Sequence, residues 1–381
     1  SVTFLEFLLD RIPIHTKEQE RMDKVFDEGV QYINSELGAE LLYEDVSVAD
    51  FLSQKIEQSL RPAMKELQHA IRVMHNLFSH IKPKLVMSMY SVGIYHAMGE
   101  LAGLFGAKAL NISHGTHVPP NNEFEKIENY RLSESVITNA YPYVAVQTPW
   151  TDKFLEYYDD PRQRIYTGPL LYSTVNQQAR EIKRKELLGE NSDCAVIVHA
   201  TTQKNRTGFR FHICETLDEY VSSLSDIIEV VNKLKNAYLV VRPHPACELS
   251  AEEFSLLLPK CDRMKIMDKG PFANILSIAD ILISYSSTCI EEATQNNIPV
   301  ILYDKWGRYN HFNIDEKEGS SLKSYPAYYV TRSQNLLNTL EHLTRNKDEV
   351  VSEKELSTFK YPEEFRDNFY KFVDETLESR V

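Results

Sequence analysis

The sequence predicts an α/β protein with two successive parallel sheets and a helical region ahead of them. Residues 1 to about 82 have the apolar spacing of helices, whereas from residue 84 short apolar runs of strand length alternate with helical stretches. A charged, polar segment at 177–192 separates two such alternations. Because alternating strands and helices form parallel sheets covered by helices, each alternation is expected to be an α/β domain of its own.

The helical region ends in one well-marked helix. Met64–His80 carries apolar residues at helical spacing, and Pro83 stops it; these apolar residues are Leu67, Ile71, Met74, Leu77 and Phe78. The opening run Ser1–Leu9 is apolar, but it lacks the basic start and small-residue cleavage site of a signal peptide. It is therefore expected to pack as a helix.

The first alternation gives the domain expected at residues 83–176. Its strands are expected at 84–90, 107–113, 143–147 and 165–170, with helices at 91–105 and 149–158. The region 1–82 is expected to pack on this domain as an added helical part. The segment 177–192 is the expected linker to the second domain.

The second alternation gives a domain expected at residues 193–345. Its strands are expected at 194–199, 237–241, 264–267, 281–283 and 300–303, and its helices at 216–235, 271–279 and 288–296. Residues 346–381 are expected to be helical. The last helix, at 362–379, is expected to fold back over the first half of the chain.

Composition excludes several classes of protein. The 42 Lys and Arg stand against 55 Asp and Glu, a net charge of −13 that disfavours sequence-independent nucleic-acid binding. The five cysteines are scattered without a CxxC pair, which fits reduced thiols better than a zinc site or a disulfide framework. No apolar run reaches the roughly 18–20 residues that a membrane span needs. Neither a GxGxxG fingerprint nor a Walker loop occurs.

Polar clusters follow several predicted strands, where ligands of parallel sheets bind. Arg242-Pro243-His244-Pro245 follows the strand at 237–241, and its prolines hold Arg242 and His244 on a rigid turn suited to an oxyanion such as phosphate. A surface turn or helix cap is the alternative. A second cluster includes Thr201, Thr202 and Lys204, which could line the same site or belong to a solvated loop.

The segment Ser284-Tyr285-Ser286-Ser287-Thr288 precedes the predicted helix at 288–296. Hydroxyls and unpaired backbone N–H groups at a helix start can bind an anion, although a plain helix cap explains Ser286, Ser287 and Thr288 equally well. Glu291 and Glu292 lie one turn later and could reach a ribose diol. Their alternative role is to complement the helix dipole.

The only His-Gly pair of the chain, His114-Gly115, follows the predicted strand at 107–113. The glycine allows close backbone approach to a ligand, and a histidine can act as a base near neutral pH. His117 and Glu123 lie on the same loop and are rival candidates for the base. A structural histidine is the alternative.

Taken together, these motifs resemble a known superfamily. Ala279–Asp304 is similar to the donor-binding segment of GT-B glycosyltransferases, in which two Rossmann-like domains face each other across a cleft. His114-Gly115, the Arg242–Pro245 turn and the Ser286-Ser287 pair resemble CDP-glycerol glycerophosphotransferases. The His-Pro and Ser-Ser motifs also resemble bacterial sialyltransferases and capsule Kdo transferases.

The resemblance implies a role for each matching residue. His244, Ser286 and Ser287 would hold the donor phosphate. From their places after the strands, Arg242, Thr288, Thr201, Thr202 and Lys204 are expected to line the same donor site. Glu292 or Glu291 would bind the ribose, and the backbone near Met267 would flank the base. His114 would be the catalytic base and residues 83–176 the acceptor-side domain. No cofactor or metal is implied.

The implied function is transfer of a sugar or polyol phosphate from a cytidine-activated donor to a bacterial surface polysaccharide. The acceptor would be a glycan or a lipid-linked glycan, and the protein would be cytoplasmic. Peripheral association with the inner face of the membrane and membership of a larger protein stay open. Two alternatives remain: a non-hydrolysing UDP-GlcNAc 2-epimerase-like isomerase, and a noncatalytic nucleotide-sugar-binding domain.

Overall fold

The computed structural model describes residues 16–115, 117–134, 136–201, 215–245, 250–317, 323–346, 349 and 351–378. The chain separates into two compact units. Unit 1 comprises Ser1–Asn111, Asn139–Tyr143 and Val373–Val381, and unit 2 comprises Ile112–Thr138 and Val144–Phe372.

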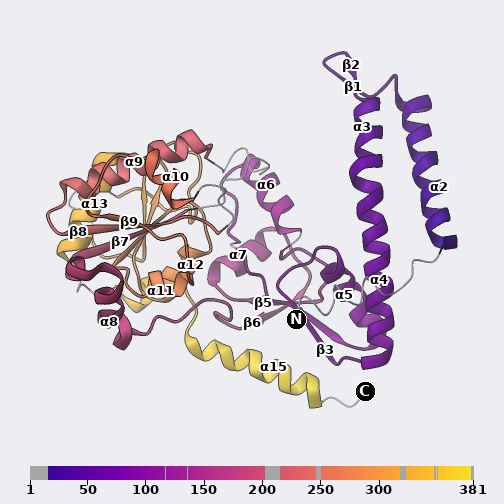
Figure 1. The fold of residues 1–381 in the computed structure, drawn as a ribbon. Helices are drawn as coiled ribbons and strands as arrows, with labels where there is room; N and C mark the ends of the chain where they lie inside the picture. The colour runs from indigo at the N-terminus through magenta and orange to yellow at the C-terminus, as the bar shows by residue number, and fades with distance from the viewer. Residues whose placement is uncertain are drawn as a thin grey trace. The chain divides into compact units, whose positions relative to one another are not determined.

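Unit 1 is mainly helical. Its helices are α2 (Thr16–Tyr32), α3 (Ala49–Lys55), α4 (Arg61–Ile81) and α5 (Ile94–Ala102). A π-helical turn, Ile56–Leu60, joins α3 to α4, and α2 runs beside them (Figure 1). A short antiparallel hairpin, β1 (Leu42–Tyr43) and β2 (Val46–Ser47), interrupts the helices. The strands β3 (Leu85–Ser88) and β4 (Lys108–Asn111) pair in parallel, as the sequence predicts.

Helix α4 shows why this part of the chain folds as it does. Pro62 lies in the first turn, where its missing N–H costs no hydrogen bond. The helix ends at Lys82, whose backbone is left-handed (φ 46°), just before Pro83. Its buried face is formed by Ala70, Val73, Met74 and Phe78. Ile71, predicted on that face, is 40% exposed.

Unit 2 is built around a six-stranded sheet whose strands are all parallel. The strand order is β12-β11-β10-β7-β8-β9. The strands are β7 (Ala195–Ala200), β8 (Ala237–Arg242), β9 (Met264–Ile266), β10 (Ile281–Ser284), β11 (Val300–Tyr303) and β12 (Ala327–Val330).

Helices cover both faces of this sheet (Figure 1). Alternate residues of β7 enter different cores, because successive strand residues point to opposite faces. Val196 and Val198 pack with α11 (Phe272–Leu276) and α12 (Cys289–Gln295). Ile197 packs with α9 (Leu217–Lys233) and α13 (Ser333–Arg345).

Unit 2 also contains most of β5 (Tyr143–Val146), all of β6 (Gln163–Tyr166) and further helices. These helices are α6 (Glu123–Ser133), α7 (Pro149–Tyr157), α8 (Gln177–Leu188), α10 (Ala251–Leu256), α14 (Glu353–Leu356) and α15 (Arg366–Glu378). The last residues of α15 belong to unit 1, where Lys84 donates a hydrogen bond to the carbonyl of Leu377. No helix among the described residues is long and apolar enough to cross a membrane.

The nine predicted strands are all present, with β6 beginning and ending a few residues early. The sequence pattern does not predict β12, α6 or α13. The segment predicted as a linker forms α8, whose Arg180 and Arg184 are bonded to Asp280. Its polar composition is that of a solvent-facing helix.

Candidate functional site

Three neighbouring strands of the six-stranded sheet bring part of the predicted site together. β10, β7 and β8 are adjacent, and the polar clusters follow their carboxyl ends. The hydroxyl of Thr201 accepts a hydrogen bond from the backbone N–H of His244 at 2.9 Å. Ser284 donates to the carbonyl of Ala200 at 2.9 Å, which fixes the start of the segment Ser284–Thr288, called the serine loop below. Thr202 and Lys204 lie outside the described residues.

Arg242 is buried, and its side chain is bonded to the loop that follows β9. Its guanidinium donates to the carbonyls of Met267, Lys269 and Gly270 at 2.7–3.0 Å. Three contacts to one loop hold the segment after β9 against the end of β8. Arg242 therefore fixes the loop that contains Met267, the residue predicted to flank a base.

His244 is half-buried on the turn that follows β8. Burial, and then the neighbouring charge of Arg242, lower the pKa of His244 below its ordinary value. The imidazole is consequently neutral at neutral pH in the absence of an anion.

The serine loop divides its hydroxyls between two uses. Ser287 accepts a hydrogen bond from the N–H of Cys289 at 3.3 Å, so it caps the start of α12. Thr288 is the N-cap residue by position, but its side chain makes no capping bond. The hydroxyl of Ser286 makes no hydrogen bond to any described residue. Ser286, which is 5% exposed, therefore has a hydroxyl that no described residue engages, as does Tyr285 in the same loop.

Glu291 and Glu292 face different surroundings. The carboxylate of Glu291 is 2% exposed and contacts His311 Nε2 at 3.1 Å. Glu292 is half-buried and accepts a hydrogen bond from the backbone N–H of Ser173 at 3.0 Å, and burial raises its pKa. Only Glu292 retains access to solvent, which favours it over Glu291 as a ligand contact.

The His114-Gly115 turn is held by its neighbours. The hydroxyl of Ser113 bonds His117 Nε2 at 2.5 Å and accepts from the N–H of Gly115 at 3.1 Å. A Cβ at position 115 would lie 3.3 Å from His117 Nε2 and 3.1 Å from a methyl of Val136, so a side chain there would require these neighbours to shift by a few tenths of an ångström. His117 is 7% exposed and acts as a support, whereas His114 is half-buried at the turn.

A buried glutamine that the sequence analysis missed ties this turn to the strands. Gln147 directly follows β5 and is 3% exposed. It donates to the carbonyl of Ser113 at 2.7 Å and accepts from the N–H groups of Leu170 and Leu171 at 3.0 and 3.1 Å. The sequence signal that could have identified Gln147 is its place as a polar residue directly after an apolar strand.

Replacing Gln147 with alanine is expected to destabilise unit 2 by about 2 kcal/mol, since a buried carbonyl and two N–H groups lose their partner. Urea unfolding measures this effect. Gln163→Ala, at an exposed position of β6, serves as the control and should change stability by less than about 0.5 kcal/mol. Equal stability of the two variants would contradict a fixing role for Gln147.

The loop that carries His114 packs against the hydrophobic core on one face of the six-stranded sheet. Val118 belongs to the same hydrophobic core as Val198 and Tyr285. Asn121 donates to the carbonyl of Asn310 at 2.8 Å. Unit 2 thereby holds the His114 loop and the loops after β7, β8 and β10 in one body. Glu123 begins α6, is 82% exposed and lies 3.4 Å from Lys126.

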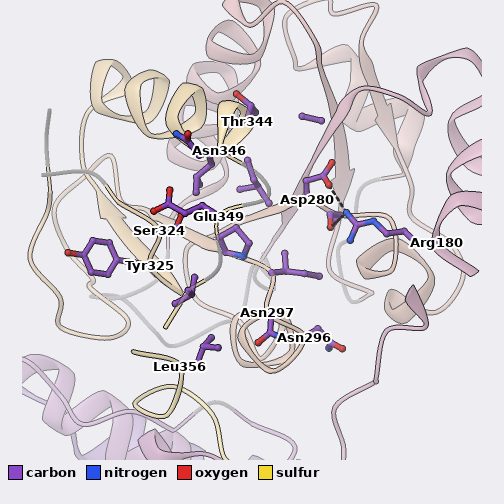
Figure 2. Close-up of a pocket in the computed structure, with 17 residues that line it drawn as sticks. Arg180, Asp280, Asn296, Asn297, Ser324, Tyr325, Thr344, Asn346, Glu349 and Leu356 are labelled. Atoms are coloured by element: carbon purple, nitrogen blue, oxygen red, sulfur yellow. Dashed lines mark hydrogen bonds and ion pairs between the residues drawn. The ribbon is translucent and has the colours of Figure 1, made fainter. Parts of the chain in front are cut away.

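A cavity of about 390 Å³ lies at the opposite edge of the sheet. Ala195, Ile281 and Tyr325 line it, near the amino ends of β7, β10 and β12 (Figure 2). The pair Arg180–Asp280 lies at one side of it, as Figure 2 shows. None of the predicted site residues lines this cavity, so it is separate from the candidate site.

Solved structures of low sequence identity share this fold. A Listeria monocytogenes protein provisionally assigned as a UDP-N-acetylglucosamine 2-epimerase has a TM-score of 0.54 at 12% identity, over 84% of this chain and 81% of that one. The S. aureus MnaA–UDP structure has a TM-score of 0.50 at 12% identity, over 82% of this chain and 80% of that one. The Neisseria meningitidis UDP-GlcNAc 2-epimerase bound to UDP-GlcNAc has a TM-score of 0.50 at 14% identity, over 83% of this chain and 82% of that one.

No protein-family model matches the sequence, and no curated protein matches it significantly. The structural likeness establishes the fold. The chain has a GT-B-like α/β fold with Rossmann-like parallel sheets and an added helical region.

Proposed function

We propose that this protein is a GT-B-type transferase that moves a sugar or polyol phosphate from a cytidine-activated donor to a glycan or lipid-linked glycan acceptor. One observation carries the proposal. Unit 2 joins the His114 turn, through Val118 and Asn121, to the body that presents His244 and the serine loop. A histidine and an anion-binding loop in one body suit proton removal and phosphate departure.

The donor phosphate would be held after β8 and β10. His244 and Ser286 would contact it directly, and the backbone N–H groups at the start of α12 would add their dipoles. Ser287 and Arg242 would act mainly by fixing the two loops. Glu292 would bind the ribose, and the backbone at Met267 would flank the base.

For a glycosyl donor the reaction is a displacement at the anomeric carbon. His114 removes the proton of the acceptor hydroxyl as its oxygen bonds to that carbon. The bond from the carbon to the phosphate oxygen breaks, and the nucleotide leaves with the electron pair. His244 and the helix start stabilise the negative charge that develops on the phosphate.

An epimerase acting on UDP-GlcNAc is the second candidate, because the similar Neisseria meningitidis structure carries that activity in its name and the Listeria monocytogenes one is provisionally assigned it. An epimerase needs no acceptor. Nucleotide release that requires an acceptor would therefore favour the transferase. Binding of a donor without any turnover would favour a noncatalytic nucleotide-sugar-binding domain.

The proposal is tested by thermal unfolding of the intact protein with CMP, CDP, UMP, UDP or GDP. A ligand that binds only the folded form raises Tm, so cytidine nucleotides are expected to raise it most. A shift with uridine nucleotides alone would favour the epimerase. No shift with any nucleotide would remove the proposal.

Replacing His244 with alanine is expected to weaken nucleotide binding roughly 10–150-fold, the equivalent of about 1.5–3 kcal/mol. Because the pKa of His244 is lowered in the free protein and a bound phosphate would raise it, binding should take up a proton. Wild-type affinity should thus rise as the pH falls from about 8 to about 6.

Calorimetry in two buffers of different ionisation enthalpy measures both quantities. The variant should lose the proton uptake together with the affinity. His342→Ala, on α13, is the matched control and should keep both. Wild-type proton uptake in the His244 variant would exclude this residue from the phosphate site.

A further inference from the structure

Two buried side chains that follow neighbouring strands each have one polar atom without a hydrogen bond among the described residues. Tyr285 directly follows β10 and is 6% exposed, and Asp304 directly follows β11 and is 1% exposed. The Tyr285 hydroxyl and Asp304 Oδ1 make no hydrogen bond to any described residue. Because a buried polar atom without a partner is costly, both atoms point to a missing group.

The surrounding contacts hold these two groups in place. Asp304 Oδ2 accepts from the N–H of Tyr309 at 2.9 Å and from the Tyr329 hydroxyl at 3.0 Å. The rings of Tyr285 and Tyr309 lie 5.7 Å apart. The Tyr309 hydroxyl contacts His311 Nδ1 at 2.9 Å, and His311 reaches Glu291. Burial raises the pKa of Asp304, while the backbone N–H groups of Tyr309, Trp306 and Arg308 act to lower it. Its Oδ1 makes no hydrogen bond to a described residue.

A third unpartnered atom belongs to Arg308, just beyond Asp304. Its Nη2 donates to Glu219 at 2.7 Å, while its buried Nε makes no hydrogen bond among the described residues. Burial, and then the charges of Asp304 and Glu215, raise the pKa of the Tyr285 hydroxyl, whereas the charge of Arg308 acts to lower it. The set offers an acceptor in Asp304 Oδ1, a donor in Arg308 Nε and a hydroxyl of Tyr285 that can do either, which matches hydroxyl groups, since each can donate and accept.

The position relative to the serine loop connects this set to the donor. Tyr285 immediately precedes Ser286, and the parallel pairing of Leu282 with Val300 and of Ile283 with Ile301 brings the end of β11 alongside. The group that a nucleotide donor transfers is attached to its phosphate. A phosphate at Ser286 would place that group next to Tyr285 and Asp304.

The charge of the set discriminates among donors. Three acidic residues, Asp304, Glu215 and Glu219, belong to these surroundings. The positive charge of Arg308 is already paired with Glu219. A carboxylate on the transferred group would be desolvated beside these acids, which disfavours ulosonic acids such as sialic acid or Kdo. A neutral polyol or neutral sugar meets no such repulsion.

We infer that Tyr285, Asp304 and Arg308 bind the hydroxyl groups of a neutral polyol or sugar carried by the activated donor. The inference rests on the proposed function and names the chemical class of the transferred group. It separates a CDP-glycerol-like or neutral sugar donor from the acidic-sugar donors.

The test compares the intact wild type with Tyr285→Phe and Asp304→Asn. Calorimetry would use CDP-glycerol, UDP-N-acetylglucosamine and CMP-sialic acid, each beside the matching free nucleotide. Tyr285→Phe should lower affinity for the neutral donor that binds by roughly 2–10-fold, the value of one hydrogen bond, and leave free-nucleotide affinity unchanged. CMP-sialic acid should bind no more tightly than CMP.

Thermal unfolding separates a ligand site from a structural one. Since its hydroxyl makes no hydrogen bond to a described residue, Tyr285→Phe should keep or raise Tm. Tyr238→Phe, near the amino end of β8, is the control for a buried tyrosine elsewhere. A lowered Tm with unchanged donor affinity means a buried water only and overturns the inference. So does tight binding of CMP-sialic acid. If no nucleotide binds the wild type, the proposed function itself fails.

Discussion

Replacing His114 with alanine is expected to lower kcat by roughly 10²–10⁴-fold while donor affinity stays within about twofold of the wild type. His114 lies at a turn fixed by Ser113, Gly115 and Gln147, apart from the residues proposed to hold the phosphate. A base of this kind affects the chemical step and not the binding step. Release of free nucleotide in the presence of acceptor measures kcat, and calorimetry measures affinity.

The pH dependence distinguishes a base from a structural histidine. A base works only when unprotonated, so the wild-type rate should fall in acid, and the variant should lose that dependence. His80→Ala, an exposed position of α4, is the control. A His114 variant that retains most of its turnover would transfer the role to another residue.

The structure ranks the rivals for that role. His117 Nε2 is engaged by Ser113, and its ring packs 5.3 Å from Phe154. Glu123 is exposed and close to Lys126. Glu123→Gln is thus the next variant to assay, because His117→Ala would also disturb the turn.

The strands of this protein could be predicted from sequence because each is a short apolar run between polar turns. β7, β8 and β10 are buried on both faces, and their residues are almost continuously apolar. β12 (Ala327–Val330) was not predicted, although it is as long as β5 and its tyrosines favour a strand. Helix periodicity located α4 and placed Met74 and Phe78 on its buried face, but Ile71 is exposed because tertiary packing buries Ala70 and Val73 instead.

The candidate site was predictable only as positions along the chain. Because residues that follow neighbouring parallel strands lie close together, the sequence indicated that His244 and Thr201 are near each other, and their hydrogen bond confirms that proximity. The sequence could not show that Arg242 turns to three carbonyls or that Glu291 faces His311, because both partners come from distant segments. Gln147 and Asp304 were missed for the same reason: a single polar residue after a strand does not reveal its partners.

Asp280 is the clearest case of a residue whose importance depends on distant partners. It precedes β10, and its carboxylate accepts from Arg180 at 2.6 Å, from Arg184, and from the N–H of Val196 at 2.7 Å. Its side chain is 17% exposed. Both arginines belong to α8, so one carboxylate attaches this helix to the amino ends of β7 and β10 (Figure 2).

Replacing Asp280 with asparagine is expected to destabilise unit 2 by about 3 kcal/mol, because two partly buried guanidinium groups lose their counter-charge. Urea unfolding measures the loss, and Asp262→Asn, at an exposed position before β9, should cost less than about 0.5 kcal/mol. The carboxylate lies at the amino edge of the sheet, away from the loops proposed to bind the donor. The folded variant should therefore bind nucleotide as the wild type does, and a loss of affinity without a loss of stability would assign Asp280 to ligand binding instead.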